Sequence, residues 1–206
     1  ASVSALAGTG TGTEVFGGTS GAAPMVTGSA ALLMQAYPDR SWAEIRAVLM
    51  NTAETDIFVA PAQFGGDLAP ISRIGGGEVR VDRAFASPLA AWNRGDLSGT
   101  LSFGFHEVTG QMDLIQRVTI RNYSDQAITL RSEVEHRFDN DATGVVRVTA
   151  PSWFTVPANG STVVPVRLFI RPQLSRPLHQ WVLNSGTQGA NGNALTQVEY
   201  DGYIHF

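Results

Sequence analysis

Ser20 is flanked by small residues and followed by an apolar run, a setting in which a serine can act as a nucleophile. The stretch from Glu14 to Pro38 reads EVFGGTSGAAPMVTGSAALLMQAYP. A serine hydroxyl attacks a carbonyl efficiently when a base, usually His, takes its proton and N–H groups stabilise the developing oxyanion. The first N–H groups of a helix lack intrahelical acceptors and can stabilise such an oxyanion. The stretch fits a plain helix N-cap at Thr19 or Ser20 equally well.

Two other motif interpretations of this segment fail. A nucleophile elbow, G-x-S-x-G, would need glycine where the sequence has Ala22. The run GTGTGT at residues 8–13 is not followed by Gly-Lys-Ser/Thr and lacks the G-x-G-x-x-G spacing. It is therefore not a phosphate-binding loop.

The longer context of Ser20 resembles the active-site serine segment of subtilases, the subtilisin-like serine proteases. The pattern is Gly-Thr-Ser, one variable residue, a small pair, Pro, one residue, Val, a small residue and Gly, and here it runs from Gly18 to Gly28. The segments SWAEIRAVLMNTA and GGGEVRVDRAFASP follow in the family's order. The resemblance covers about residues 1–88. It implies that Ser20 is the nucleophile and that its own N–H is one oxyanion donor.

The resemblance also implies catalytic partners that lie upstream of the serine. In subtilases an Asp, a His and an oxyanion-hole Asn precede it by long distances, and the nineteen residues before Ser20 include none of these types. Two positions differ from residues common in the family, with Gly21 in place of Met and Met25 in place of His. We therefore expect a fragment of a secreted or cell-envelope subtilisin-like endopeptidase, inactive without its upstream part.

The histidines of the sequence offer no substitute base. All four follow the serine segment and lie in a strand-rich region, where we interpret each as an ordinary strand residue; they are His106, His136, His179 and His205. The alternative function is a non-catalytic binding or structural module, including an inactive protease homologue. The gene sequence upstream of Ala1 distinguishes the two.

Helices dominate the predicted first half. Residues 27–37 are apolar almost all round, which predicts a helix buried in the middle of a domain. Ser41 and Glu44 form a capping-box pattern that opens a second helix, and a short helix is predicted over 81–85. We expect an α/β remnant of a subtilisin-like domain. Its apolar helix then needs a cover from the second half, a second copy, or the missing part as a separate chain.

From residue 99 the pattern changes to a period of two, which predicts the antiparallel strands of an all-β sandwich. Turn-forming residues gather at 122–126, 139–144 and 157–161. The segments RVTIRNYSD, VPANGSTVVPVRL and VEYDGYIHF resemble the fibronectin type III-like domain that follows the catalytic domain in some secreted subtilases. That resemblance implies packing, spacing or substrate-contacting roles. The predicted domains are residues 1–92 and 93–206.

Polar residues of the second half suggest two weaker kinds of site. Asp139, Asn140 and Asp141 could hold Ca²⁺, although a hairpin turn explains them as well. Asn122 and Asn159 each begin an Asn-x-Ser glycosylation pattern, and Asn159 is followed by glycine, as in a turn.

Aromatic residues of the second half give a third weak candidate. Trp153, Phe154 and Trp181 could form a ligand patch, and the alternative is that they belong to the sandwich core.

Composition excludes several classes of function. The sequence has no cysteine, so disulfides and thiolate metal sites are impossible. A net charge of −4 with scattered basic residues gives no general attraction for nucleic acid. The longest apolar run, residues 30–34, is far shorter than the ~18–20 residues of a membrane span. We expect no metal or cofactor, and the expected partners are a peptide or protein substrate and the upstream part of the protease domain.

Overall fold

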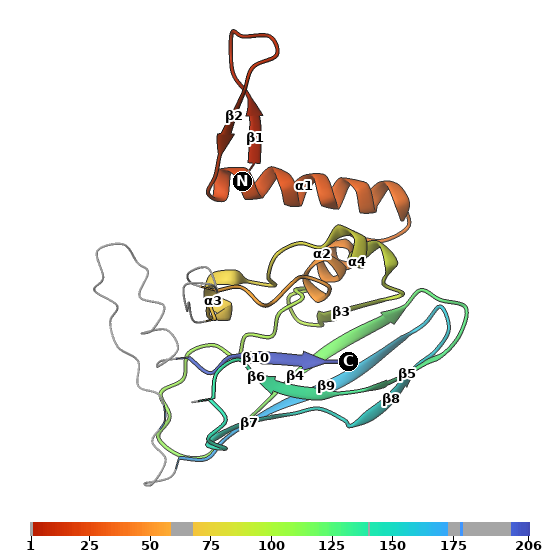
Figure 1. The fold of residues 1–206 in the computed structure, drawn as a ribbon. Helices are drawn as coiled ribbons and strands as arrows, with labels where there is room; N and C mark the ends of the chain where they lie inside the picture. The colour runs from red at the N-terminus through yellow and green to blue at the C-terminus, as the bar shows by residue number, and fades with distance from the viewer. Residues whose placement is uncertain (1, 59–67, 140, 173–177, 179–198) are drawn as a thin grey trace.

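The computed structural model describes residues 2–58, 68–139, 141–172, 178 and 199–206, in which a helical part lies against a strand-rich part (Figure 1). In chain order the elements are β1 (Ser2–Ala5), β2 (Thr13–Phe16), α1 (Thr19–Ala36), α2 (Trp42–Asn51), α3 (Ile71–Ile74), α4 (Val81–Ala86), β3 (Leu89–Asn93), β4 (Met112–Asn122), β5 (Ile128–Arg131), β6 (Glu133–His136), β7 (Val146–Thr149), β8 (Trp153–Val156), β9 (Ser161–Ile170) and β10 (Gly202–His205).

The helical part is built around α2. The capping box predicted at its start is confirmed, because the Glu44 N–H donates to the Ser41 hydroxyl at 3.3 Å and the Ser41 N–H donates to the Glu44 carboxylate at 2.7 Å. The apolar side of α2 faces inward. With one residue each from α1, α4 and β3 it forms a single core of Leu33, Ile45, Ala47, Val48, Leu49, Ala84 and Ala90.

The strand-rich part contains three antiparallel sheets among the described residues. One has the order β3-β4-β9-β7, and the pairs β10-β6 and β5-β8 form the others. Alternate residues of the long strands are buried, as the period of two predicts. They form a second core of Val118, Ile120, Val156, Val164 and Val166, which residues from β5 and β10 also contact. This arrangement is consistent with the predicted β-sandwich.

α1 differs from the prediction in length and in burial. It begins at Thr19, eight residues before the predicted start, and Gly21 and Leu33 are its buried residues. Met25 and Leu32 are 60% and 58% exposed. α1 packs on α2 and α4 along one side only (Figure 1). The predicted central burial is therefore wrong for the described chain, and the described residues of the second half do not cover this helix. No described helix is long and apolar enough to cross a bilayer.

The two halves meet at β3. This strand pairs along its length with β4, from Leu89 opposite Asn122 to Asn93 opposite Val118, and α2 packs against it. Most of β3 thus precedes the predicted division between residues 92 and 93 while belonging to the sheet of the second half. The division itself stays a prediction.

Candidate active-site serine

Ser20 lies in the first turn of α1, where the chain leaves the β1–β2 hairpin (Figure 1). β2 is connected to the helix by Gly17 and Gly18. Gly18 has a φ of 86°, which glycine adopts without strain. Gly18 is also the N-cap, and no side chain caps the helix. The interpretation of Thr19 or Ser20 as an N-cap is therefore wrong, because both residues are already helical.

The backbone at this helix start leaves an N–H group unpaired at Ser20. The Gly18 carbonyl accepts from the N–H groups of Gly21 and Ala22 at 3.0 and 3.1 Å. Within the described chain, the Ser20 N–H has no acceptor. An unpaired N–H at the positive end of a helix dipole suits the stabilisation of a developing oxyanion.

The Ser20 side chain is exposed, and its hydroxyl makes no hydrogen bond to any described residue. The described histidines lie elsewhere. His136 and His205 are on β6 and β10, as predicted, whereas His106 lies outside any strand, against that prediction, with Nε2 2.5 Å from the Phe103 carbonyl. His179 falls outside the described residues. The described chain therefore supplies a hydroxyl and an oxyanion-type donor together, with no base beside them.

The glycines near Ser20 have no packing explanation within the described chain. A Cβ added at Gly17, Gly18 or Gly28 would meet no heavy atom within 4 Å. Gly77 shows the opposite case, because a Cβ there would lie 2.2 Å from the Glu54 carbonyl oxygen. The space beside Gly17 and Gly28 is thus open to an approaching backbone, as peptide hydrolysis at Ser20 would require.

α1 is fixed at the end opposite Ser20. The Tyr37 hydroxyl donates to the Phe85 carbonyl of α4 at 2.5 Å. The guanidinium of Arg40 lies between two rings, 3.8 Å from the centroids of both Tyr37 and Tyr123. Such cation–π stacking is strongest where water is excluded. α1 is therefore held by its C-terminal end, while its serine end extends away from the body of the molecule (Figure 1).

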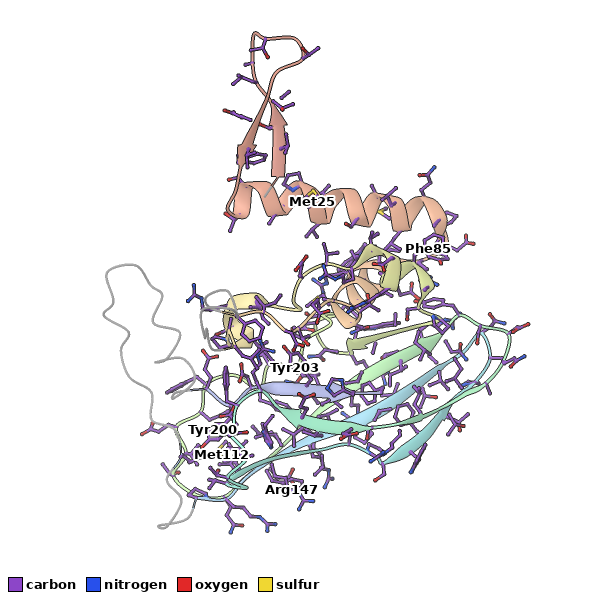
Figure 2. The ribbon with its side chains drawn as sticks, viewed as in Figure 1. Met25, Phe85, Met112, Arg147, Tyr200 and Tyr203 are labelled. Carbon is purple, nitrogen blue, oxygen red and sulfur yellow. The ribbon has the colours of Figure 1, made fainter. Side chains whose placement is uncertain are left out.

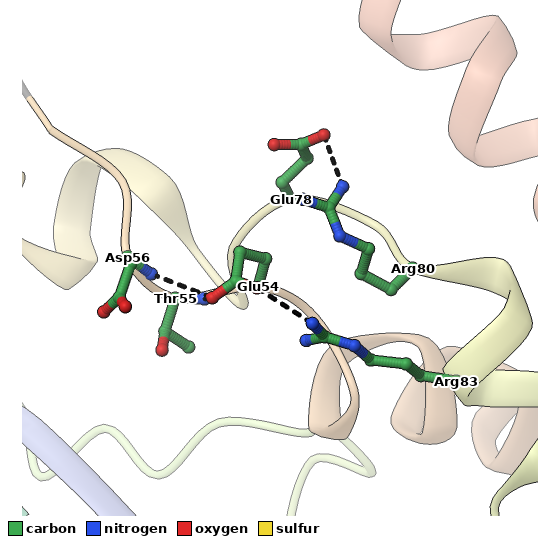
Figure 3. Close-up of polar contacts among 6 residues, drawn as sticks. All are labelled: Glu54, Thr55, Asp56, Glu78, Arg80 and Arg83. Atoms are coloured by element: carbon green, nitrogen blue, oxygen red, sulfur yellow. Dashed lines mark hydrogen bonds and ion pairs between the residues drawn. The ribbon is translucent and has the colours of Figure 1, made fainter. Parts of the chain in front are cut away.

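Glu54 connects the segment after α2 to the segment before α4 (Figure 3). Its backbone pairs with that of Glu78, and its carboxylate accepts from Arg83 at 3.0 Å and from the N–H of Thr55 at 3.1 Å. The hydrogen bond from Arg83 is the main cause that holds the pKa of Glu54 below its usual value. The pair is partly exposed, with the Arg83 side chain at 50% and that of Glu54 at 28%, so it orients the segment and adds little stability.

The comparison with known families bears on the same segment. Residues 3–87 match the sequence model of the subtilase family. The subtilase match includes Ser20, α1, α2 and α4, and it ends before β3. It supports an origin of this segment in a subtilisin-like serine protease, a family whose intact members hydrolyse peptide bonds. No curated protein matches the chain. The role of Ser20 itself stays a prediction.

Among the described residues the weaker polar candidates do not gather into a metal site, and one of the two glycosylation candidates is buried. Asp141 is fully buried and its carboxylate accepts from the Asp201 N–H at 3.2 Å, whereas Asp139 is exposed and its carbonyl closes a turn. Asn140 lies outside the described residues, and no metal-type cluster occurs among those described. Asn122 is fully buried, and its side-chain amide donates to three backbone carbonyls. In this fold Asn122 is therefore inaccessible to glycosylation.

The remaining candidates divide between turn and core. Asn159 is exposed with a φ of 48° in the turn between β8 and β9, which agrees with the turn interpretation. Phe154 packs edge-on against Phe206 with ring centroids 5.6 Å apart, as expected for core. Trp153 is 64% exposed, so its assignment to the core is wrong. Trp181 lies outside the described residues.

Proposed function

We propose that the first half of this chain is the nucleophile-bearing C-terminal part of the catalytic domain of a secreted or cell-envelope subtilisin-like serine endopeptidase, with Ser20 as its nucleophile. The single observation that carries the proposal is the position of Ser20. It combines an exposed hydroxyl and an unpaired N–H in the first turn of a helix that lies within the subtilase match. We also propose that the second half is a fibronectin type III-like domain, supported by its packed antiparallel sheets.

The reaction of the intact protein would be acyl transfer. The Ser20 oxygen attacks the peptide carbonyl, while an upstream His takes the hydroxyl proton and passes it to the leaving amine as the C–N bond breaks. Water then attacks the acyl-enzyme and releases the acid, restoring the Ser20 hydroxyl. This chain contributes the nucleophile and one oxyanion donor. An upstream Asp, His and Asn contribute the rest, so the chain alone is inactive.

The test is active-site labelling of the protein expressed with its upstream gene sequence, using a fluorescent serine-directed phosphonate and a peptide substrate. Ser20→Ala abolishes labelling and turnover. Ser29→Ala is the matched control, because it removes a hydroxyl from the same helix. That hydroxyl already donates to the Met25 carbonyl at 2.8 Å. Labelling retained in Ser20→Ala would contradict the assignment. Turnover by the 206-residue chain alone would contradict the need for upstream residues.

The non-catalytic module remains the second candidate, because no described base lies beside Ser20. An upstream sequence without the Asp, His and Asn segments would favour it.

A further inference from the structure

We propose that the second half is a permanent brace for the serine-bearing half, fastened to it by the buried side chain of Arg137. The inference concerns how the two halves hold each other and does not depend on the chemistry of Ser20. It distinguishes the second half from a loosely tethered neighbour, the usual expectation for domains that share a small polar interface.

Arg137 follows β6 in the second half, and its guanidinium reaches three backbone carbonyls of the first half. It donates from Nε to Ala69 at 2.8 Å, from Nη1 to Thr55 at 2.8 Å and from Nη2 to Ile57 at 3.2 Å. The residue is only 8% exposed. A buried charge is costly unless its donors are satisfied, and here the first half satisfies them. The planar fork of arginine can bridge several acceptors in this way, which a lysine ammonium cannot reproduce.

The second half completes the same cluster from its own side. Arg137 Nη1 donates to the Tyr203 hydroxyl at 3.0 Å, and the Arg137 N–H donates to the Asp201 carbonyl at 2.9 Å. The Asp201 carboxylate in turn accepts from the Ile71 N–H of α3 at 2.7 Å. Hydrogen bonds therefore cross between the halves in both directions. Figure 2 shows Tyr203 where the strand-rich part meets the helical part.

A second set of contacts ties α2 itself to the strands. The Asn51 side chain accepts from the Ala91 N–H of β3 at 2.8 Å. At the other end of α2, the Tyr123 hydroxyl donates to the Glu44 carboxylate at 2.8 Å. Burial raises the pKa of Glu44, but hydrogen bonds from Ser41 and Tyr123 outweigh it and hold that pKa below its usual value. The carboxylate is therefore ionised at neutral pH and accepts strongly.

These contacts predict which segments lose stability when Arg137 is replaced. Removing the guanidinium leaves the Ala69 carbonyl without this donor, and it leaves the carbonyls of Thr55 and Ile57 with only their backbone donors, the N–H groups of Ile57 and Ala69. They belong to the segments that follow α2 and precede α3. If the second half is a brace, replacing Arg137 should therefore loosen the first half. If it is only a tethered domain, the replacement should disturb only the residues around 137.

The experiment is amide hydrogen exchange on the full 206-residue chain, read by mass spectrometry. In Arg137→Met, peptides covering residues 42–57 and 68–74 exchange roughly ten- to hundredfold faster, as expected for the loss of hydrogen bonds from a charged group, while β4 and β9 stay protected. Arg147→Met is the matched control, because Arg147 is an exposed arginine of β7 that lies apart from the helical part (Figure 2). It leaves the exchange of both halves unchanged.

Unchanged exchange at residues 42–57 in Arg137→Met, or acceleration confined to residues near 137, overturns the proposal. If Arg137→Met does not fold, Arg137→Lys replaces it. That variant keeps the charge but cannot reach three carbonyls at once, so the same first-half peptides exchange faster than in the wild type. Exchange equal to the wild type in Arg137→Lys would overturn the proposal as well.

Discussion

α1 and α2 follow one another in the chain and are both rich in apolar and small residues, yet they differ in burial. α2 buries five of its ten residues, whereas α1 buries two of eighteen. The difference comes from their partners: α2 lies between α1, α4 and β3, while α1 has α2 and α4 on one side. Apolar composition therefore indicates that a helix is stabilised by burial, and the elements around it determine whether that burial occurs.

The largest effect that we expect distinguishes two neighbouring leucines of α1. Leu33 is completely buried against α2, and Leu32 is 58% exposed. Leu33→Ala should lower the free energy of unfolding by about 3 kcal/mol through lost burial and a cavity. Leu32→Ala should change it by less than about 0.5 kcal/mol. Urea unfolding of both variants measures the contrast, and equal losses would show that the outer face of α1 is covered in solution.

The next largest effect on stability that we expect concerns the N-termini of α1 and α2. The Ser41 hydroxyl caps α2, whereas no side chain caps α1. We therefore expect Ser41→Ala to cost about 1 kcal/mol of unfolding free energy. Thr19→Ala serves as the control and should cost a few tenths at most, since Thr19 makes no capping bond. A larger loss from Thr19→Ala in the same urea series would reverse the assignment of the two caps.

The last effect that we expect is a pH dependence of the free energy of unfolding, and it comes from Asp201. Burial, reinforced by the charge of Asp141, raises the pKa of Asp201 from 3.8 to about 6. A raised pKa favours the folded state while the group is protonated, so this contribution is full below about pH 3.8 and is lost as the pH rises through about 6.

Asp201→Asn removes this titration and keeps an acceptor for the Ile71 N–H. Between about pH 4 and 7, the wild type should lose on the order of 1 kcal/mol relative to this variant, a figure reduced because the group is partly solvated. Urea unfolding of both proteins across that range checks the sign. Parallel curves would mean that Asp201 titrates as it does in the unfolded chain.

Local patterns were readable from the sequence, and long-range ones were not. The capping box at Ser41 involves residues three apart, so its letters suffice to predict it. The start of α1 at Thr19 was missed because Gly21, Pro24 and Gly28 are poor helix formers. The exposure of Met25 could not be predicted, because burial depends on which surfaces meet.

The same difference between local and long-range patterns applies to the candidate site and to Arg137. The alternative of an N-cap at Thr19 or Ser20 was wrong about the capping residue, which is Gly18, but it placed a helix boundary beside the serine that the apolar pattern of residues 27–37 missed. Arg137 carried no signal, since its acceptors lie 68 to 82 residues away in the chain and are backbone carbonyls that any residue could provide. An arginine in an alternating strand pattern is ordinarily solvent-exposed.

The exposed face of α1 has a consequence for oxidation chemistry. Met25 and Met34 are 60% and 54% exposed, and the sequence has no cysteine to react in their place. Exposed thioethers convert to sulfoxides, whereas buried ones are protected. Both methionines therefore report on the surroundings of the serine helix: mild peroxide should oxidise them readily in the 206-residue chain, and any protein segment that covers α1 should slow the reaction at these two positions.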